Sequence, residues 1–145
     1  LELLKCDNPP RVPQDHSKAT YCAKRTPEDG FINWVWSAKT VWTLIRAVTK
    51  PYPGAFTYYK NKKIIIWDAS CIDDSVYIGL PGQIQKISKE GIIVTCGDGK
   101  CLFLKEMEIE DETEIELTKA FKIHDKFGIT FLDVYRNILE IEKEK

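Results

Sequence analysis

The stretch Arg46–Phe56 constrains the fold of this chain more than any other, because it joins a helical pattern to a strand pattern through a Pro-Tyr-Pro-Gly turn at 51–54. The residue before a proline is pushed out of the helical region, so a helix that enters this stretch ends at or before Lys50. After Gly54 the apolar spacing changes to that of a strand. The stretch therefore predicts a sharp transition from helix to strand.

The helix before this turn has a clear start and one apolar face. Ser37 is suited to cap it, because its hydroxyl can accept a hydrogen bond from a free backbone N–H of the first turn. Apolar residues follow at the spacing i, i+3, i+4 and i+7 of one helix face: Val41, Leu44, Ile45 and Val48. We expect these four side chains to be buried against the strands. We also expect Gly54 to hold a backbone angle or a close contact that a Cβ would disturb.

Short strands and tight turns follow the helix. Five segments have strand patterns: Phe56–Tyr59, Lys63–Ala69, Gln83–Ile87, Ile92–Cys96 and Cys101–Met107. Turn residues lie between them, among them Lys60-Asn61-Lys62 and Gly97-Asp98-Gly99. Such a series favours a small antiparallel barrel of the OB-like kind. The predicted fold class is mostly β with helices: this barrel, one amphipathic helix before it and a C-terminal helix.

The two ends of the chain differ from this central part. Proline-rich and turn-forming residues predict a loop at 5–15 and a linker near 24–33. After Gly128, helical spacing recurs at Phe131, Val134, Tyr135 and Ile138, so we expect an amphipathic helix that docks on the barrel. We therefore divide the chain into a domain end and linker at 1–33, a barrel domain at 34–110 and an acidic, helix-bearing tail at 111–145.

Charge and cysteine content argue against several classes of protein. Residues 1–105 carry 15 basic and 10 acidic side chains, and residues 106–145 carry 6 and 12. This is not the strongly basic face of a typical nucleic-acid-binding protein.

The 5 Cys residues cannot all pair and include no Cys-x-x-Cys, so we expect reduced thiols, a cytoplasmic location and no metal site. No apolar run approaches a membrane span. Because the chain starts at Leu1 without Met, we interpret it as a piece of a longer protein.

Several blocks occur in order and match one pattern: Ala19–Lys24, Pro27–Trp34, Ile45–Phe56, Lys63–Ala69 and Ile92–Gly99. Together they resemble the C-terminal region of the 10-formyltetrahydrofolate-dependent formyltransferases. This family includes methionyl-tRNA formyltransferase and the amino-sugar N-formyltransferases. The resemblance implies that residues 1–30 end a Rossmann-like catalytic domain and its linker, and that residues 34–110 form the family's small OB-like domain.

The resemblance also implies that this chain is not catalytic alone. In the family, an Asn, a His and an Asp of the N-terminal domain act beside a Ser-Leu-Leu-Pro-like loop. The reaction needs a base near the amine and polar groups for the formyl oxygen. Asn8 and His16 do not fit this set, because a proline-rich loop separates them. The sequence departs from the family at Asn33, where an Asp is usual, and in the tail after Ile109.

The implied parent enzyme moves a formyl group from 10-formyltetrahydrofolate to an amine of an amino-sugar nucleotide or of methionyl-tRNA. This chain would bind no cofactor itself. Its implied partners are its own N-terminal catalytic domain and the acceptor, without a membrane, and a homo-oligomer is left open. The block at 51–56 looks slightly closer to the amino-sugar branch, and the missing basic face also disfavours tRNA.

Three cations are the candidate substrate-binding residues. Lys24 and Arg25 stand at the junction of the two implied domains, where they would contact a phosphate of the acceptor or would simply be solvated. Arg46 lies at the edge of the apolar helix face. It would bind substrate, or it would have a structural role with loop carbonyls or an acid such as Asp29. No residue is assigned a catalytic or metal-binding role.

Two alternatives from other classes remain open. A stand-alone OB-like binding module for nucleic acid or oligosaccharide would present exposed rings flanked by lysines. The rings in question are Tyr52, Phe56, Tyr58, Tyr59 and Trp67, and the lysines are Lys60, Lys62 and Lys63. A structural domain, which buttresses the catalytic half or mediates dimerisation, would show a continuous exposed apolar patch.

Overall fold

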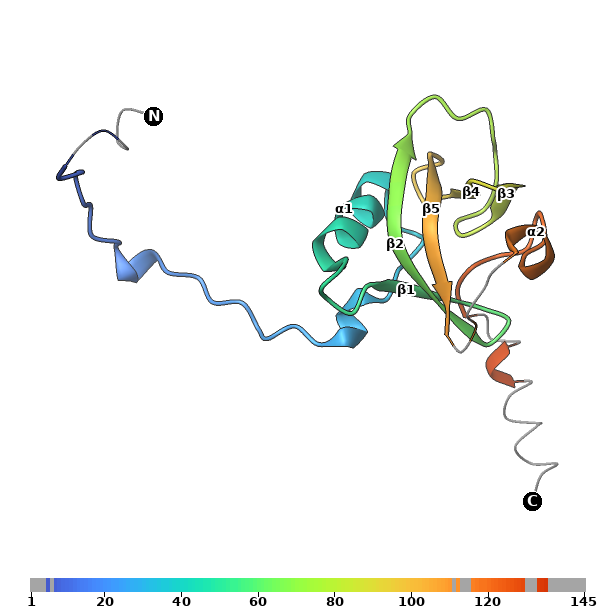
Figure 1. The fold of residues 1–145 in the computed structure, drawn as a ribbon, viewed down its shortest axis with the longest axis horizontal. Coiled ribbons are helices and arrows are strands. Elements are labelled where there is room, and N and C mark those ends of the chain that lie inside the picture. The colour runs from blue at the N-terminus through green and yellow to red at the C-terminus, as the bar shows by residue number, and fades with distance from the viewer. Residues whose placement is uncertain (1–4, 6, 111, 113–115, 130–132, 136–145) are drawn as a thin grey trace, which may run out of the picture.

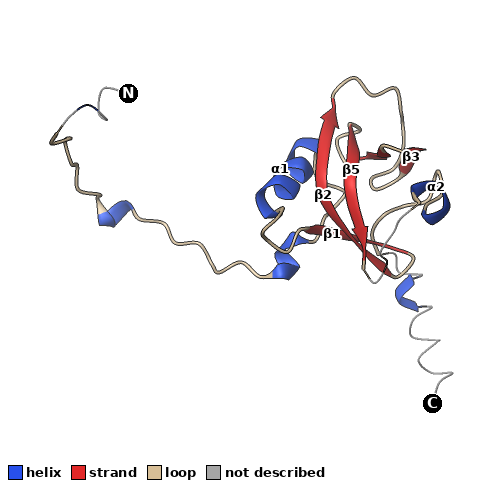
Figure 2. Cartoon of the chain, viewed as in Figure 1, coloured by secondary structure: helices blue, strands red, loops and turns tan. Residues whose placement is uncertain are grey.

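The computed structural model describes residues 5, 7–110, 112, 116–129 and 133–135. Figures 1 and 2 show a β-rich body with an N-terminal segment that extends away from it. Between residues 7 and 26 that segment has one short 3-10 turn, η2 (His16–Lys18), and its side chains are almost all exposed. A second 3-10 turn, η3 (Pro27–Gly30), brings the chain onto the body. There Ile32 is buried, and its N–H donates to Phe56 O at 2.8 Å.

The body is built on one antiparallel sheet of five strands in the order β1-β2-β5-β4-β3. The strands are β1 (Ala55–Tyr59), β2 (Lys62–Ile72), β3 (Ile84–Ser88), β4 (Gly91–Thr95) and β5 (Cys101–Ile109). This confirms the mostly β fold class and all five predicted strands. β2 continues three residues beyond the predicted end at Ala69, because its register with β5 holds as far as Ile72 and Cys101.

Local turn chemistry sets the two hairpins that the sequence predicted most clearly. Lys60 and Asn61 both have positive φ, which suits the tight turn between β1 and β2. In the turn between β4 and β5, Cys96 N–H donates to Lys100 O at 2.8 Å, and Gly99 N–H donates to Cys96 O at 3.0 Å. The run Gly97-Asp98-Gly99 is therefore a hairpin turn, as predicted.

Helix α1 (Ala38–Val48) packs on β2 and has two caps at its N-terminus. Ser37 Oγ accepts from Thr40 N–H at 3.2 Å, which confirms the predicted N-cap. Asp98 Oδ1, from the β4–β5 turn, accepts from Ala38 N–H at 3.2 Å. The second cap joins the helix to the β4–β5 hairpin.

The buried face of α1 differs from the predicted one. Val41 and Ile45 are fully buried as expected, but the third fully buried position is Ala38. Leu44 and Val48 are only half-buried, so the expectation of full burial fails for these two, although both still pack against the core. The reason is geometric: the sheet contacts the line through 38, 41 and 45, and the neighbouring line through 44 and 48 faces the linker.

A segment at residues 121–128 lies between the two edge strands. Phe127 N–H donates to Gly82 O at 2.9 Å beside β3, and Gly128 N–H donates to Tyr58 O of β1 at 2.8 Å. Within the described residues no ladder joins β1 directly to β3, so the OB-like closure stays a prediction. Phe121 and Phe127 are buried in the same core as Trp34 and Tyr59, so the packed unit extends beyond residue 110.

The tail matches only part of its prediction. A four-residue helix, α2 (Leu117–Ala120), was not predicted, and it precedes the buried Phe121. Of the predicted C-terminal helix only residues 133–135 are described, and they are helical. Phe131 and Ile138 lie outside the described residues. In the part of the chain that the structure describes, no helix has both the length and the apolar content to span a membrane.

Candidate functional site

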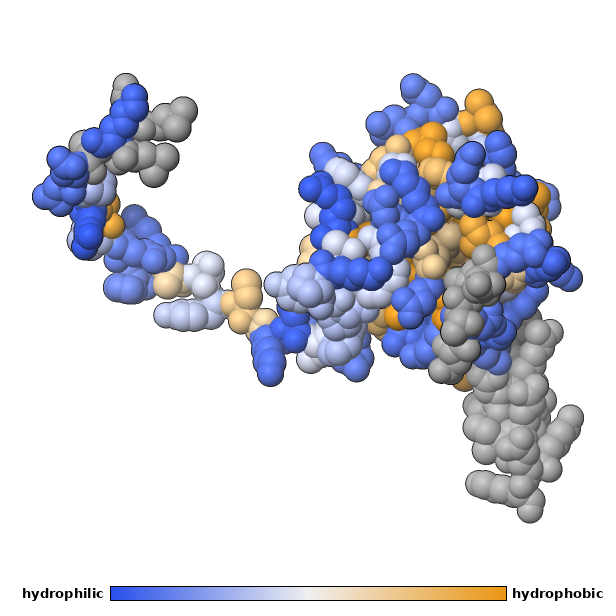
Figure 3. Space-filling view, in the orientation of Figure 1, coloured by the Kyte–Doolittle hydropathy of each residue, from blue (hydrophilic) through white to orange (hydrophobic). Residues whose placement is uncertain are grey.

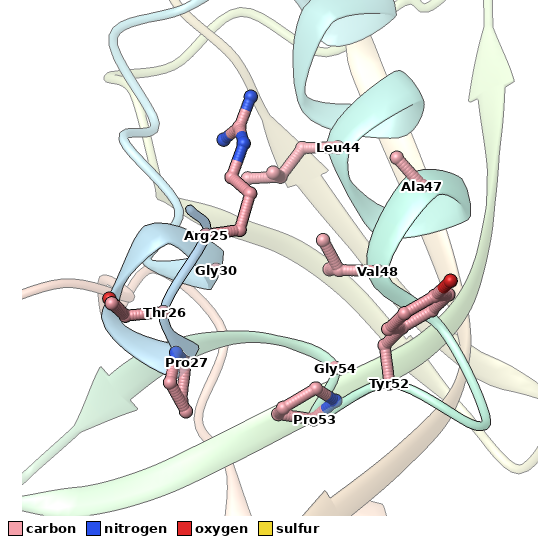
Figure 4. A pocket seen from close by; sticks show the side chains of 10 residues that line it. All are labelled: Arg25, Thr26, Pro27, Gly30, Leu44, Ala47, Val48, Tyr52, Pro53 and Gly54. Carbon is pink, nitrogen blue, oxygen red and sulfur yellow. The ribbon is translucent and has the colours of Figure 1, made fainter. Parts of the chain in front are cut away.

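The candidate site is a groove of about 440 Å³ between the linker and the C-terminal half of α1 (Figure 4). Three segments form it: the linker with η3, helix α1, and the turn that leads into β1. Its lining residues are Arg25, Thr26, Pro27, Gly30, Leu44, Ala47, Val48, Tyr52, Pro53 and Gly54. The half-buried face of α1 is therefore one wall of the groove.

Close backbone contact holds the linker against the turn. A Cβ at Gly30 would lie 2.6 Å from Gly54 O, so only a glycine permits this approach. Gly54 itself has φ +89°, and a Cβ there would lie 2.5 Å from Ile65 Cγ2 and 2.8 Å from Trp67 Cζ3. This is the constraint expected at Gly54, and it explains why the groove forms where the Pro-Tyr-Pro-Gly turn meets β2.

Backbone hydrogen bonds shape both sides of the groove. Tyr52 N–H donates to Thr49 O at 3.1 Å, and Gly54 N–H donates to Val48 O at 2.9 Å, so the turn folds back on the helix end. On the linker side, Thr26 N–H donates to Asp29 Oδ2 at 2.7 Å and begins η3. The side chain of Thr26 also lowers the pKa of the exposed Glu28 carboxyl by hydrogen bonding. Neither Glu28 nor Asp29 lines the groove.

The structure separates the three predicted site residues. Arg25 lines the groove, and in Figure 4 its side chain extends toward the helix face that carries Leu44. Lys24 is exposed beside it but does not line the groove. Arg46 is exposed on α1, where its guanidinium lies over the Trp42 ring, 4.5 Å from the centroid. Among the described residues Arg46 has no ion pair with Asp29.

Sequence reasoning missed the apolar wall of the groove, and it considered Tyr52 only as one of five rings of a stand-alone binding module. Leu44 and Val48 were assigned to the core, and Ala47 had no role. Tyr52 is 63% exposed, although it lies in a turn whose prolines and glycine restrict the backbone. An aromatic side chain held outward on such a restricted turn is the signal that could have indicated a site.

A second cavity, of about 430 Å³, lies at the other end of α1. It is lined by Ala38, Lys39, Trp42, Cys71, Asp73, Asp98 and Lys100. Lys100 Nζ pairs with Asp73 Oδ1 at 3.0 Å, so its main charges satisfy each other. Burial raises the pKa of Cys71, and burial raises the pKa of the neighbouring Cys96 to about 12. These thiols are therefore mostly protonated, and so weakly nucleophilic, at neutral pH. Within the described residues no His, Cys, Asp and Glu group is placed to hold a metal ion.

A stand-alone binding module would present exposed aromatic rings flanked by free lysines, and the structure meets this criterion only in part. Of the five rings, Tyr52 is exposed, Phe56, Tyr58 and Trp67 are half-buried, and Tyr59 is buried. The three flanking lysines all contact carboxylates: Lys60 contacts Asp125, Lys62 contacts Glu112, and Lys63 contacts Glu110. Paired lysines have little free charge to offer a phosphate backbone. The geometry therefore gives this alternative little support.

A structural domain would show an exposed apolar patch, and exposed apolar side chains lie in the loop between β2 and β3. Val76 is 88% exposed and Ile78 is 98% exposed. Figure 3 shows apolar surface, in orange, where this loop lies. Nothing in the described residues covers these side chains, and the structural alternative stays a prediction.

Comparison with known proteins agrees with this fold. The family model described as "Formyl transferase, C-terminal domain" matches residues 24–125. A methionyl-tRNA formyltransferase from Acetivibrio thermocellus is 42% identical over 100 residues, which are 69% of this chain but only 32% of that enzyme. The chain thus spans about a third of the length of this curated relative. We expected the sequence to depart from the family after Ile109. The family match continues to residue 125, so this expectation is wrong for residues 110–125.

Solved structures show the same fold at low identity. One is a HypX from Aquifex aeolicus in complex with tetrahydrofolic acid, with a TM-score of 0.55, 20% identity, and coverage of 76% of this chain and 18% of that one. A substituted variant of the same HypX gives a TM-score of 0.57 at 20% identity, with coverage of 84% and 23%. At this identity the likeness concerns the fold alone. From the family match over residues 24–125 we conclude that the chain belongs to the formyl transferase C-terminal domain family.

Proposed function

We propose that this chain is the acceptor-binding domain of a formyltransferase that moves a formyl group from 10-formyltetrahydrofolate to the amine of methionyl-tRNA. The observation that carries the proposal is the groove at the linker, in which Arg25 stands on an otherwise uncharged wall. In a family member the linker is where catalytic and C-terminal domains meet, so an acceptor held there lies between them.

The identity of the acceptor is the finer part of this proposal. The block at 51–56 favoured an amino sugar, and the modest net charge also disfavoured tRNA. The 42% identity with a methionyl-tRNA formyltransferase now favours the tRNA. The low net charge is also a weaker argument against tRNA, because Lys24 and Arg25 have no ion pair among the described residues and remain available to phosphates.

We assign the chemistry to a catalytic domain that uses the folate. That domain would supply the base for the amine and the polar groups that stabilise negative charge on the formyl oxygen. This chain would hold and orient the acceptor, which contributes to rate by positioning. A location in the cytoplasm and a homo-oligomeric state remain predictions.

A domain exchange tests this function. Residues 24–145 of this chain would replace the C-terminal domain of the Acetivibrio thermocellus enzyme. Formylation would then be measured with 10-formyltetrahydrofolate and either methionyl-tRNA or a nucleotide-linked amino sugar. We expect the chimera to formylate methionyl-tRNA at least about tenfold faster than the isolated catalytic domain, and this chain alone to give no turnover.

Three results would contradict the proposal. A chimera no faster than the isolated catalytic domain would remove the acceptor-binding role. Turnover of the amino sugar in place of methionyl-tRNA would overturn the choice of acceptor. Formyl transfer by this chain alone would overturn the division of labour.

A further inference from the structure

The loop between β2 and β3 exposes its side chains with the period of a strand. Val76 is 88% exposed, Ile78 is 98% exposed and Leu80 is 57% exposed, whereas the two residues between them are half-buried. A period of two is that of an extended strand. In Figure 1 the loop forms an arch beyond the end of β2. Three apolar side chains therefore project from one side of an extended segment.

The inner side of this loop is fixed to the sheet. Ser75 Oγ donates to Cys101 Sγ of β5 at 3.1 Å. A Cβ at Gly79 would lie 2.0 Å from Gln85 Nε2 of β3, so the backbone of the loop lies directly on that side chain. The loop thus holds its outward side chains in place before any partner binds. Such preorganisation lowers the entropic cost of association.

The backbone of the loop also has unpaired donors. Among the described residues, the N–H groups of Val76 and Ile78 have no hydrogen-bond partner. Residues 75–82 carry no charged side chain that would repel another segment of the same kind. An extended, apolar segment with unpaired backbone groups is a template for pairing with a second extended segment.

We propose that this loop is a self-association surface, through which two copies of the chain pair about a twofold axis with their loops antiparallel and centred on Ile78. The pattern Val-x-Ile-x-Leu is its own complement in this arrangement. Ile78 meets Ile78 of the second copy, and Val76 meets Leu80. The same patch therefore serves both copies, as a twofold contact requires.

Charges at the two ends of the loop favour the antiparallel arrangement. The exposed Asp74 precedes the apolar residues. At the other end, Phe127 N–H donates to Gly82 O, and the exposed Lys126 is adjacent. Neither Asp74 nor Lys126 has an ion pair among the described residues. Antiparallel pairing brings the acidic end of each copy toward the basic end of the other, whereas parallel pairing would bring like charges together.

The self-association surface is separate from the groove at the linker. The linker joins the sheet at the start of β1, where Phe31 bridges to Phe56. Phe56 pairs with Ile65 of β2, and the loop leaves β2 after Ile72. Seven residues of strand lie between these two positions, a distance of roughly 20 Å. The association therefore does not depend on which acceptor the parent enzyme uses.

Sedimentation velocity of the full chain over a range of concentrations tests the proposal. Ile78→Asp places two carboxylates against each other at the twofold axis. Val35→Asp is the matched control, because Val35 is an apolar residue of the same body that is 69% exposed outside the loop. The melting temperature of each variant shows whether it folds. We expect a dimer that dissociates on dilution, since the patch is small. Ile78→Asp should weaken it at least about tenfold, and the control should leave it unchanged.

Cross-linking tests the register of the two loops. In a chain that carries Cys6→Ser and Cys22→Ser, Ile78→Cys should be linked into dimers by a short bismaleimide, because residue 78 meets its own copy. Val35→Cys should give no more dimer than the Cys6→Ser, Cys22→Ser chain without a further cysteine. Dilution below the dissociation constant should abolish the product.

Three results would overturn the proposal. A chain that stays monomeric at every concentration has no such surface. A dimer that withstands Ile78→Asp, or that gives no cross-link at residue 78, uses another surface. Binding of the isolated catalytic domain of the Acetivibrio thermocellus enzyme, lost with Ile78→Asp and without any dimer of this chain, would assign the loop to a contact between domains.

Discussion

The hydroxyl of Tyr59 donates a hydrogen bond to Asp125 Oδ2 at 2.6 Å and so joins β1 to the segment at 121–128. Lys60 Nζ approaches the same oxygen at 2.7 Å. The carboxylate thus ties together two parts of the chain that are far apart in sequence. Hydrogen bonds from Lys60 and then Tyr59 lower the pKa of Asp125.

We predict that Asp125→Asn lowers the free energy of unfolding by about 1 kcal/mol near neutral pH. The effect is modest because the Asp125 side chain is 33% exposed and solvent screens the pair. Since its folded pKa lies below the unfolded value, the stabilisation is complete above about pH 4 and is lost as the pH falls through the folded pKa. Thermal unfolding at neutral and acidic pH checks this, and the gap between wild type and variant should shrink in acid.

Asp15→Asn is the control for that series. Asp15 also has a lowered pKa, from hydrogen bonds with Ser17, but it lies on the exposed N-terminal segment. Its substitution should leave the melting temperature unchanged at every pH. A gap for Asp125→Asn that does not depend on pH would contradict the assignment of the carboxylate to this link.

The packing of α1 gives a second prediction. Ile45→Ala should cost about 2–5 kcal/mol, because it leaves a cavity between the helix and β2. Leu44→Ala should cost less than half as much, since Leu44 faces the groove and is only half-buried. Lys39→Ala, at an exposed position, should change stability by no more than about 0.5 kcal/mol. Urea denaturation of the three variants measures the order, and a larger loss at Leu44 would show that the helix is rotated from its position here.

The turn at Gly54 gives a third prediction. Gly54→Ala should destabilise the protein by about 1–3 kcal/mol more than Gly99→Ala does. Both glycines have positive φ, so both substitutions carry a similar backbone cost. They differ in space: a Cβ at Gly54 meets Ile65 and Trp67, whereas nothing lies within 4 Å of a Cβ at Gly99. The comparison by thermal unfolding isolates the steric part, and equal losses would mean that the turn can move away from β2.

Arg46 gives a fourth prediction, which separates it from Arg25. Arg46→Gln should cost about 0.5–1 kcal/mol of stability through its lost contact with Trp42. It should leave unchanged the rate at which the chimera formylates methionyl-tRNA. Arg25→Gln should do the reverse, because Arg25 has no such ring contact among the described residues. Melting temperatures of both variants and formylation rates of the corresponding chimeras test this, and slower formylation with Arg46→Gln would restore its predicted role in substrate binding.

The sequence alone was sufficient for the features that depend on near neighbours. The start of α1 at Ser37, its end before Pro51 and the two hairpin turns follow from capping and turn preferences, which act within a few residues. The five strands follow in the same way from short β-branched or alternating runs bounded by turn residues. The family resemblance was also visible at this level, because its blocks keep their order along the chain.

The tertiary structure decided everything that depends on contacts between distant residues. The position of β5 between β2 and β4, and the burial of Phe121 and Phe127 in the core, leave no periodic signal that a local pattern can reveal. The same holds for the face of α1 that the sheet covers. The groove depends on the contact of Gly30 with Gly54, which places Arg25 opposite Leu44 and Val48. Side-chain spacing along a helix predicts an apolar face, but only packing determines which part of that face meets the core and which part stays open to a ligand.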